Sequence, residues 1–108
     1  MSVNLSDQAQ LEIEAATFRR LLAHLDSHKE VQNLDLMNLA HFCRNCLAKW
    51  YQAGAEAQGK KVSYDDARKA VYGMPYNEWK DKHVTEATDA QKRAFQETKP
   101  LHSKISGH

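Results

Sequence analysis

The chain has 108 residues, of which 42% are hydrophobic and 27% charged, and its formal net charge is +1. This length fits one domain that folds without a metal or a disulfide. The near-neutral charge excludes a strong electrostatic attraction to nucleic acid or to an anionic membrane. No segment approaches the roughly 20 consecutive apolar residues that a membrane-spanning helix needs.

The first predicted helix covers Asp7–Asp26, with Ser6 as its N-cap. Its apolar residues recur every three or four positions and form one stripe, as expected of an amphipathic helix. These residues are Leu11, Ala15, Phe18, Leu21, Leu22 and Leu25. Ser27 and Glu30 then form a capping-box pattern, which indicates a turn or a new helix start.

The second predicted helix is long and covers residues 33–58, with Gly59 directly after its end. Its apolar residues lie on one side at 100° per residue, and we expect the other helices to pack around it. The residues on that side are Leu36, Leu39, Cys43, Leu47, Trp50 and Gly54.

Two shorter helices follow in the sequence. Ser63 and the acidic residues after it indicate a helix start, and Gly73 follows its predicted end at Tyr72. Pro75 suits the first turn of the next helix, because its missing N–H needs no partner there.

Thr88 and Gln91 form another capping-box pattern, which predicts a fifth segment to about Thr98 that Pro100 ends. No stretch alternates with the period of two that is typical of strands. The sequence therefore predicts an all-α, compact, single-domain bundle of four to five helices around a long central helix. The ordered core is expected over about residues 7–98, with a frayed tail over about residues 100–108.

Three stretches carry a resemblance to a known family: FRRLLAHL, VQNLDLMNLAHFCRNCLAKWY and VYGMPYNEWK. In this order and spacing, from about Phe18 to Ala87, the chain resembles the short bacterial proteins of the Domain of Unknown Function 1244 family. The resemblance implies a small helical fold, and it implies no activity because the family's function is not established. It also leads us to expect a small residue such as glycine at the position of His41.

The CRNC sequence places Cys43 and Cys46 three residues apart, on one face of a helix. Such a pair serves as a redox site or as half of a zinc site. The long predicted helix places Cys43 several turns from its N-terminus, where the helix dipole does not stabilise a thiolate. In the predicted hairpin, His24 and His28 lie too far from Cys43 to complete a zinc site with the cysteines. We therefore favour buried structural thiols, and we predict no metal and no cofactor.

Polar side chains on the same predicted helix form the second candidate site, consisting of Asp35, Asn38, Arg44 and Asn45. Short amides are not favoured by helix propensity, so the stripe suggests a pocket or an interface that binds a partner. The alternative is a solvated face, or a hydrogen-bond network that fixes neighbouring loops.

Aromatic residues and a methionine around Gly73 and Pro75 form the third candidate, an aromatic turn of Tyr72, Met74, Tyr76 and Trp79. Tyrosine and tryptophan are enriched in recognition patches. They also occupy core corners, and that alternative stays open.

No catalytic signature such as a nucleophile elbow or a phosphate loop occurs in the sequence. We therefore expect a non-enzymatic interaction module that binds a protein partner or a second copy of itself as a homodimer. The alternative is a thiol-based redox or metal-binding protein that uses Cys43 and Cys46. Single-stranded nucleic acid stacking on the aromatic turn is not expected, because the chain has near-neutral charge. Two cysteines in one tetrad and an N-terminus without a secretory pattern favour the cytoplasm.

Overall fold

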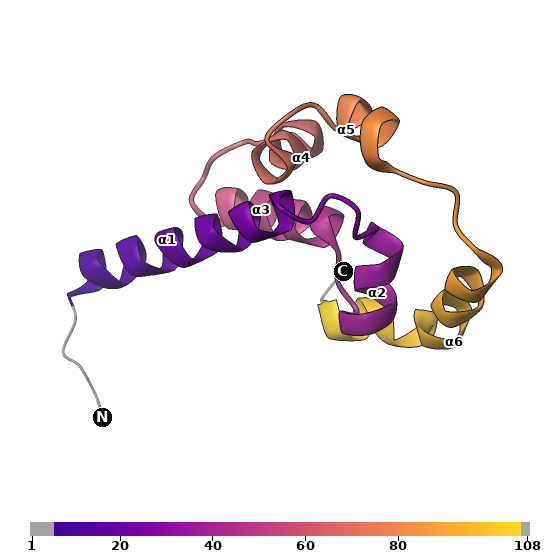
Figure 1. Ribbon diagram of the computed structural model, residues 1–108. Coiled ribbons are helices and arrows are strands. Elements are labelled where there is room, and N and C mark those ends of the chain that lie inside the picture. The colour runs from indigo at the N-terminus through magenta and orange to yellow at the C-terminus, as the bar shows by residue number, and fades with distance from the viewer. Residues whose placement is uncertain (1–5, 107–108) are drawn as a thin grey trace.

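The structure is a computed structural model that describes residues 6–106, with side chains to His102. Over that range it contains six helices and no strand, which confirms the all-α prediction (Figure 1). The helices are α1 (Asp7–Asp26), α2 (Asn33–Ala40), α3 (Arg44–Ala57), α4 (Tyr64–Tyr72), α5 (Tyr76–His83) and α6 (Asp89–Ser106). Residues 1–5, part of the segment tested for a secretory pattern, lie outside the described range.

The predicted helix starts are confirmed by their capping hydrogen bonds. The hydroxyl groups of Ser6 and Ser63 each accept a bond from the backbone N–H three residues on, at 3.1 Å. Thr88 and Gln91 exchange the two bonds of a capping box, at 3.1 and 2.7 Å. Ser27 starts no helix, because it is the C-cap of α1 and a turn follows it.

The prediction of one long helix over residues 33–58 is wrong, because the helix is interrupted between α2 and α3. His41 has a φ of 63°, in the left-handed region, and its N–H donates to the Met37 carbonyl. A left-handed residue at this position ends a helix. Cys43 is then extended and becomes the N-cap of α3. The break raises the number of helices above the predicted four to five.

The prediction that Pro100 ends the last helix is also wrong, since α6 continues to Ser106. His102 lies beyond the proline and is buried, and its Nε2 atom is 2.7 Å from the hydroxyl oxygen of Thr98. Its ring also contacts Phe95, with 4.9 Å between the ring centroids. These contacts hold the turn that contains the proline. Residues 107–108, the end of the predicted frayed tail, lie outside the described range.

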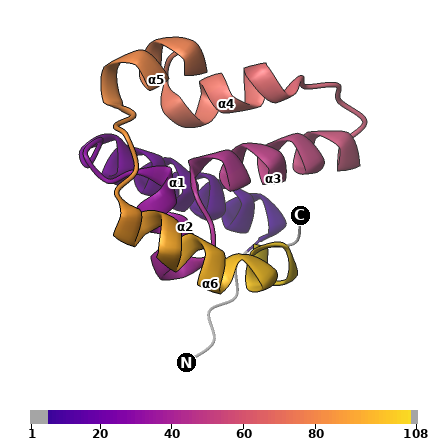
Figure 2. The same ribbon diagram turned by 90° about the vertical axis from the view of Figure 1, so that its right-hand side faces the viewer.

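The core lies between α3, α4 and α5. In Figure 2, α3 and α4 run side by side with α5 above, while α2 and α6 form a second pair below. Because α2 is separate from α3, Leu39 does not join the core and is 87% exposed. The buried core residues are Leu47, Ala48, Ala67, Val71, Tyr72 and Trp79.

Helix α1 is peripheral, and none of its residues is fully buried. Its second half packs on the core through Phe18, Leu22 and Leu25. Its first half extends beyond the rest of the molecule in Figure 1, and Leu11 there is 60% exposed. The apolar stripe of α1 is therefore covered over only part of its length.

Candidate functional site

Arg44, the first residue of α3, is buried and binds backbone carbonyl groups instead of carboxylates. Its guanidinium donates to the carbonyl oxygens of Val31 at 2.7 Å and His28 at 3.1 Å, and to Oδ1 of Asn33 at 3.1 Å. Its Cζ atom lies 4.9 Å from the centroid of the Trp79 ring. Burial lowers the pKa of Arg44 below its usual range. The side chain therefore links the end of α1 to α2, α3 and α5.

Tyr72 on α4 is buried, and its hydroxyl group connects two amide side chains. The hydroxyl donates to Oδ1 of Asn45 at 2.7 Å and accepts from Nδ2 of Asn33 at 2.9 Å. Burial raises the pKa of Tyr72 above its usual range. Asn45 and Asn33 are thus held in fixed orientations at the starts of α3 and α2.

Asp35 and Asn38 join α2 to the first turn of α6. The Asp35 carboxylate accepts from Nε2 of Gln91 at 2.8 Å and from the backbone N–H of Gln32 at 3.0 Å. Nδ2 of Asn38 donates to the Gln91 carbonyl at 3.0 Å. Oδ1 of Asn38 is buried without a hydrogen-bond partner among the described residues.

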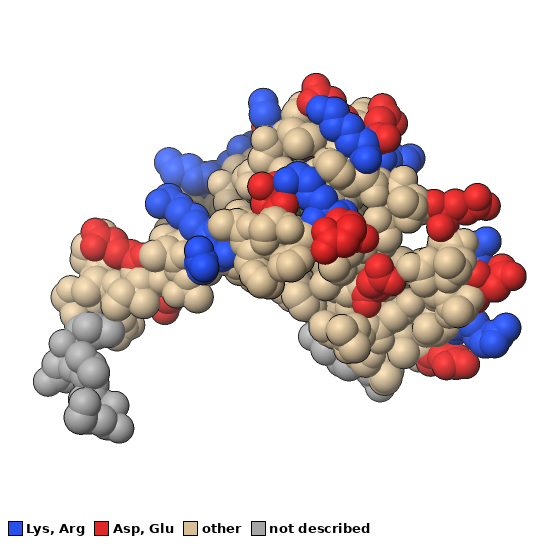
Figure 3. Space-filling view, viewed as in Figure 1, with Lys and Arg blue, Asp and Glu red and all other residues tan. Residues whose placement is uncertain are grey.

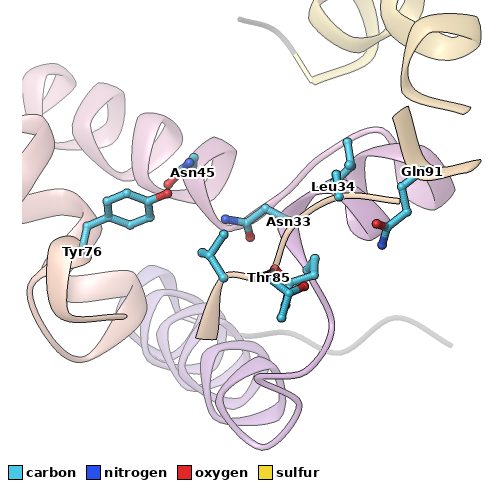
Figure 4. Close-up of a pocket in the computed structure, with 9 residues that line it drawn as sticks. Asn33, Leu34, Asn45, Tyr76, Thr85 and Gln91 are labelled. Atoms are coloured by element: carbon cyan, nitrogen blue, oxygen red, sulfur yellow. Dashed lines mark hydrogen bonds between the residues drawn. The ribbon is translucent and has the colours of Figure 1, made fainter. Parts of the chain in front are cut away.

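A cavity of about 260 Å³ lies where these contacts meet (Figure 4). In the view of Figure 4 the Tyr76 ring points toward Asn45, and Gln91 comes from the opposite side. This pocket is lined by Gln32, Asn33, Leu34, Asn45, Tyr76, Val84, Thr85, Ala87 and Gln91. No lining residue carries a charge. The pocket brings together Asn45 of the predicted polar stripe and Tyr76 of the predicted aromatic turn.

Most of the amide groups in the pocket wall are already bound at both ends. Gln32 donates to the His83 carbonyl at 2.9 Å and accepts from the Thr85 N–H at 3.1 Å. Asn33 and Gln91 are likewise engaged through both their oxygen and their nitrogen atoms. Asn45 differs, because only its oxygen has a partner within residues 6–106. Its Nδ2 group is the amide donor that the wall leaves for a ligand.

The structure separates the members of the aromatic turn. Tyr72 and Trp79 are buried in the core, with 4.8 Å between their ring centroids. Met74 and Tyr76 are half-buried at its edge. The Cζ atom of Arg68 lies 4.2 Å from the centroid of the Tyr76 ring, a cation–π contact. Tyr76 therefore presents one part of its ring to Arg68 and another to the pocket.

The two cysteines lie at the N-terminus of α3, so the sequence-based placement of Cys43 several turns inside a helix is wrong. The Sγ atoms of Cys43 and Cys46 are 3.9 Å apart, and both residues are buried. The backbone N–H groups of Asn45 and Cys46 favour a Cys43 thiolate, but burial outweighs them and raises the pKa of Cys43 to about 11.

The zinc site that the sequence raised as an alternative has no ligand set in the described part of the chain. No group of three or more histidine, cysteine, aspartate or glutamate side chains that could hold a metal ion lies within it. His24 and His28 contact each other at the end of α1, with 4.7 Å between their ring centroids.

Basic and acidic side chains are interspersed on the face in Figure 3. None of the helices within residues 6–106 combines the length and the apolar character needed to cross a bilayer.

A comparison with protein families identifies the family of this chain. The family described as "Protein of unknown function (DUF1244)" matches residues 31–97, which is more than half of the chain. The chain belongs to the DUF1244 family. The matched span contains the whole pocket and both cysteines of this DUF1244 protein, and it leaves α1 outside. No curated protein matches the chain.

Sequence reasoning missed the part of the pocket that comes from the connection between α5 and α6. Val84, Thr85 and Ala87 lie there, and no motif marks them. Gln91 did carry a signal, since the capping-box pattern picked it out as a helix-start residue. Its second contact, to Asp35, spans 56 residues and is a product of the tertiary fold.

Proposed function

We propose that this DUF1244 protein is a non-enzymatic cytoplasmic interaction module whose pocket binds an uncharged segment of a protein partner. The observation that carries the proposal is the Asn45 side chain. Tyr72 holds its oxygen atom at 2.7 Å, and the Nδ2 donor is left in the wall of an uncharged cavity. The two cysteines form no disulfide in the structure, which supports the cytoplasmic location.

The size and chemistry of the pocket favour a peptide over a cofactor. Its volume of about 260 Å³ is below the roughly 300–1,000 Å³ typical of sites for drug-sized ligands. It suits one side chain or a short stretch of backbone. An amide donor binds a carbonyl oxygen, which a protein backbone offers at every residue. Tyr76 adds aromatic contact area at the edge of the pocket.

Site-specific crosslinking tests this proposal. The photoreactive residue p-benzoylphenylalanine replaces Thr85, an exposed residue of the pocket wall, in cells of the natural source. We expect one or a few discrete crosslinked proteins after irradiation. The Asn45→Asp variant keeps an acceptor for Tyr72 and removes the donor, so it should abolish these products. Asn77→Asp, the same change at an exposed position of α5, should leave them unchanged.

Two results would contradict the proposal. One is crosslinking that persists at full yield in the Asn45→Asp variant. The other is the absence of any product with the probe at Thr85. A thermal melting curve for each variant shows that a lost crosslink does not come from unfolding.

We also propose that the module forms a homodimer through α1, which is exposed along much of its length. A shallow groove on α1 is lined by Gln8, Leu11, Glu12, Ala15, Ala16 and Arg19. Glu12 and Arg19 are equally far in sequence from the Ala15–Ala16 midpoint. A two-fold axis at this point, with the helices antiparallel, places each Glu12 against Arg19 of the second copy. In Figure 3 acidic side chains lie toward the free end of α1 and basic ones further along it.

Charge reversal combined with analytical ultracentrifugation tests the dimer. We expect a concentration-dependent dimer for the unmodified protein, and a monomer for Glu12→Arg and for Arg19→Glu. The double variant exchanges the two charges and should restore the dimer. A mass of one chain at all concentrations, or no difference between the single and double variants, would exclude this interface.

A further inference from the structure

Three sulfur atoms meet at the junction of α2 and α3, outside the pocket. The Sγ atom of Cys46 lies 3.9 Å from Sγ of Cys43 and 3.9 Å from Sδ of Met37. Cys43 is the N-cap of α3, Cys46 lies in its first turn, and Met37 comes from α2. We propose that these three sulfur atoms bind one Cu(I) ion, at a site separate from the proposed partner pocket.

The two distances from Cys46 Sγ match those of sulfur atoms that share one metal ion. Three sulfur atoms in a plane around one ion, each at the roughly 2.3 Å of a metal–thiolate bond, are about 4 Å apart. The separations of Cys46 Sγ from Cys43 Sγ and from Met37 Sδ are each 3.9 Å. The break at His41 produces this arrangement, because it turns α3 so that its first turn faces the last turns of α2.

The identity of the ligands selects the metal. Thiolate and thioether groups are soft ligands that favour Cu(I), whereas zinc sites need four ligands from thiolate, imidazole or carboxylate groups. The described residues supply no third side chain of the zinc-binding types at this place. Cu(I) is stable with two or three sulfur ligands. Cys43 is 7% exposed and Cys46 is 1% exposed, so the site is nearly dry.

The surrounding charges suit the complex. Cu(I) binding displaces two thiol protons, so two thiolates and one monovalent cation leave a single net negative charge. The N-terminus of α3 provides backbone N–H groups toward Cys43, from Asn45 and Cys46. The buried guanidinium of Arg44 interacts electrostatically with Cys43 as well. These groups offset part of the charge of the complex, and the metal cation replaces the protons that burial favours on the free thiols.

The thioether of Met37 favours metal binding over disulfide chemistry, which is the alternative for a cysteine pair. A dithiol that forms a disulfide uses only its two thiols, and Met37 has no part in that reaction. Attack on a disulfide substrate also requires an accessible thiol, and both cysteines are buried.

The experiment is an anaerobic competition for Cu(I) between the reduced, full-length protein and the chelator bicinchoninate. We expect one Cu(I) per chain, with three sulfur neighbours in X-ray absorption spectra. Met37→Leu keeps the size and both thiols and removes one ligand. It should weaken binding by at least about tenfold, since the loss of even a residue supporting a ligand costs about 10–100-fold. It should also leave two sulfur neighbours. Met74→Leu, the same change at another half-buried methionine, should leave the affinity unchanged.

Three results would overturn the proposal. The first is an affinity of Met37→Leu equal to that of the unmodified protein. The second is Cu(I) binding that survives Cys43→Ser and Cys46→Ser together. The third is no protection of Cu(I) from bicinchoninate at any protein concentration. Met37→Leu is the decisive variant, because both thiols remain in place and circular dichroism can confirm its fold.

Discussion

The hydroxyl group of Tyr72 lies 2.7 Å from Oδ1 of Asn45, on the opposite side of the α3–α4 interface. The same hydroxyl accepts from Asn33, so one phenol group joins α4 to the first turns of both α2 and α3. Its hydrogen bonds keep the segments on either side of the α2–α3 break in register. They also decide which end of the Asn45 amide is available to a ligand.

Removal of this hydroxyl in Tyr72→Phe should destabilise the fold by about 1–3 kcal/mol, because Oδ1 of Asn45 and Nδ2 of Asn33 both lose their partner. Urea unfolding followed by circular dichroism measures the change. Tyr51→Phe is the matched control, since Tyr51 is 41% exposed, and it should have little effect. Equal effects of the two substitutions would show that the Tyr72 hydrogen bonds add nothing to stability.

Alkaline pH should weaken the protein through the same residue. Burial raises the pKa of Tyr72 above the ordinary value of 10.0. Above pH 10.0 the unfolded state loses this proton while the folded state keeps it, so the free energy of unfolding falls as pH rises. Below that pH the contribution is fully present. The free energy of unfolding, measured at pH values on either side of 10.0, should fall less steeply with pH for Tyr72→Phe than for the unmodified protein. Identical slopes in the two proteins would contradict the role of Tyr72.

Replacement of Arg44 by lysine should destabilise the fold. The Arg44 guanidinium serves several acceptors in a planar fork, which a single ammonium group does not reproduce. Hydrogen bonds that involve a charged group contribute about 1.5–3 kcal/mol each, so we expect Arg44→Lys to cost about 2–3 kcal/mol. Thermal and urea unfolding provide the measurement. Arg93→Lys on the exposed side of α6 should be neutral, and a neutral Arg44→Lys would contradict the role of the fork.

Glycine at position 41 should stabilise the fold. A left-handed backbone costs a non-glycine residue about 1–2 kcal/mol, and His41 has a φ of 63°. The ring contact of His41 with His102, 5.7 Å between centroids, offsets part of the gain. We therefore expect His41→Gly to raise the free energy of unfolding by about 0.5–1 kcal/mol. Ala53→Gly, in the interior of α3, should lower it by a similar amount, and the opposite pair of signs would refute the explanation.

Local signals predicted most of the fold correctly. The bounds of α1 and the starts of α4 and α6 follow from capping residues whose hydrogen bonds involve neighbours three positions away. The break at His41 was missed because hydrophobic periodicity continues across it, from Leu39 to Leu47. The spacing of apolar residues carries no information on the backbone φ angle of an individual residue such as His41. The resemblance gave the available signal, a small residue such as glycine expected at position 41, because glycine tolerates the left-handed region that ends a helix.

The site was predictable only in pieces. Asn45 and Tyr76 were singled out for their chemistry, and the structure places both in one pocket wall. The sequence could not pair them with Thr85 or Gln91, because those contacts depend on how the connection after α5 passes the start of α2. The cysteine pair was found from its spacing. Its third sulfur neighbour, Met37, was not, because the predicted continuous helix concealed the turn that brings it close.

The attachment of α1 to the rest of the chain has a consequence for how the protein tolerates change. Arg44 binds the carbonyl oxygens of His28 and Val31, and every amino acid carries that group. These contacts therefore depend on the position of the backbone and not on the side chains at positions 28 and 31. These hydrogen bonds set no requirement on the side chains at positions 28 and 31, whereas they require a guanidinium at position 44. A scan of all substitutions should show broad tolerance at the former two positions beside strict selection at the latter.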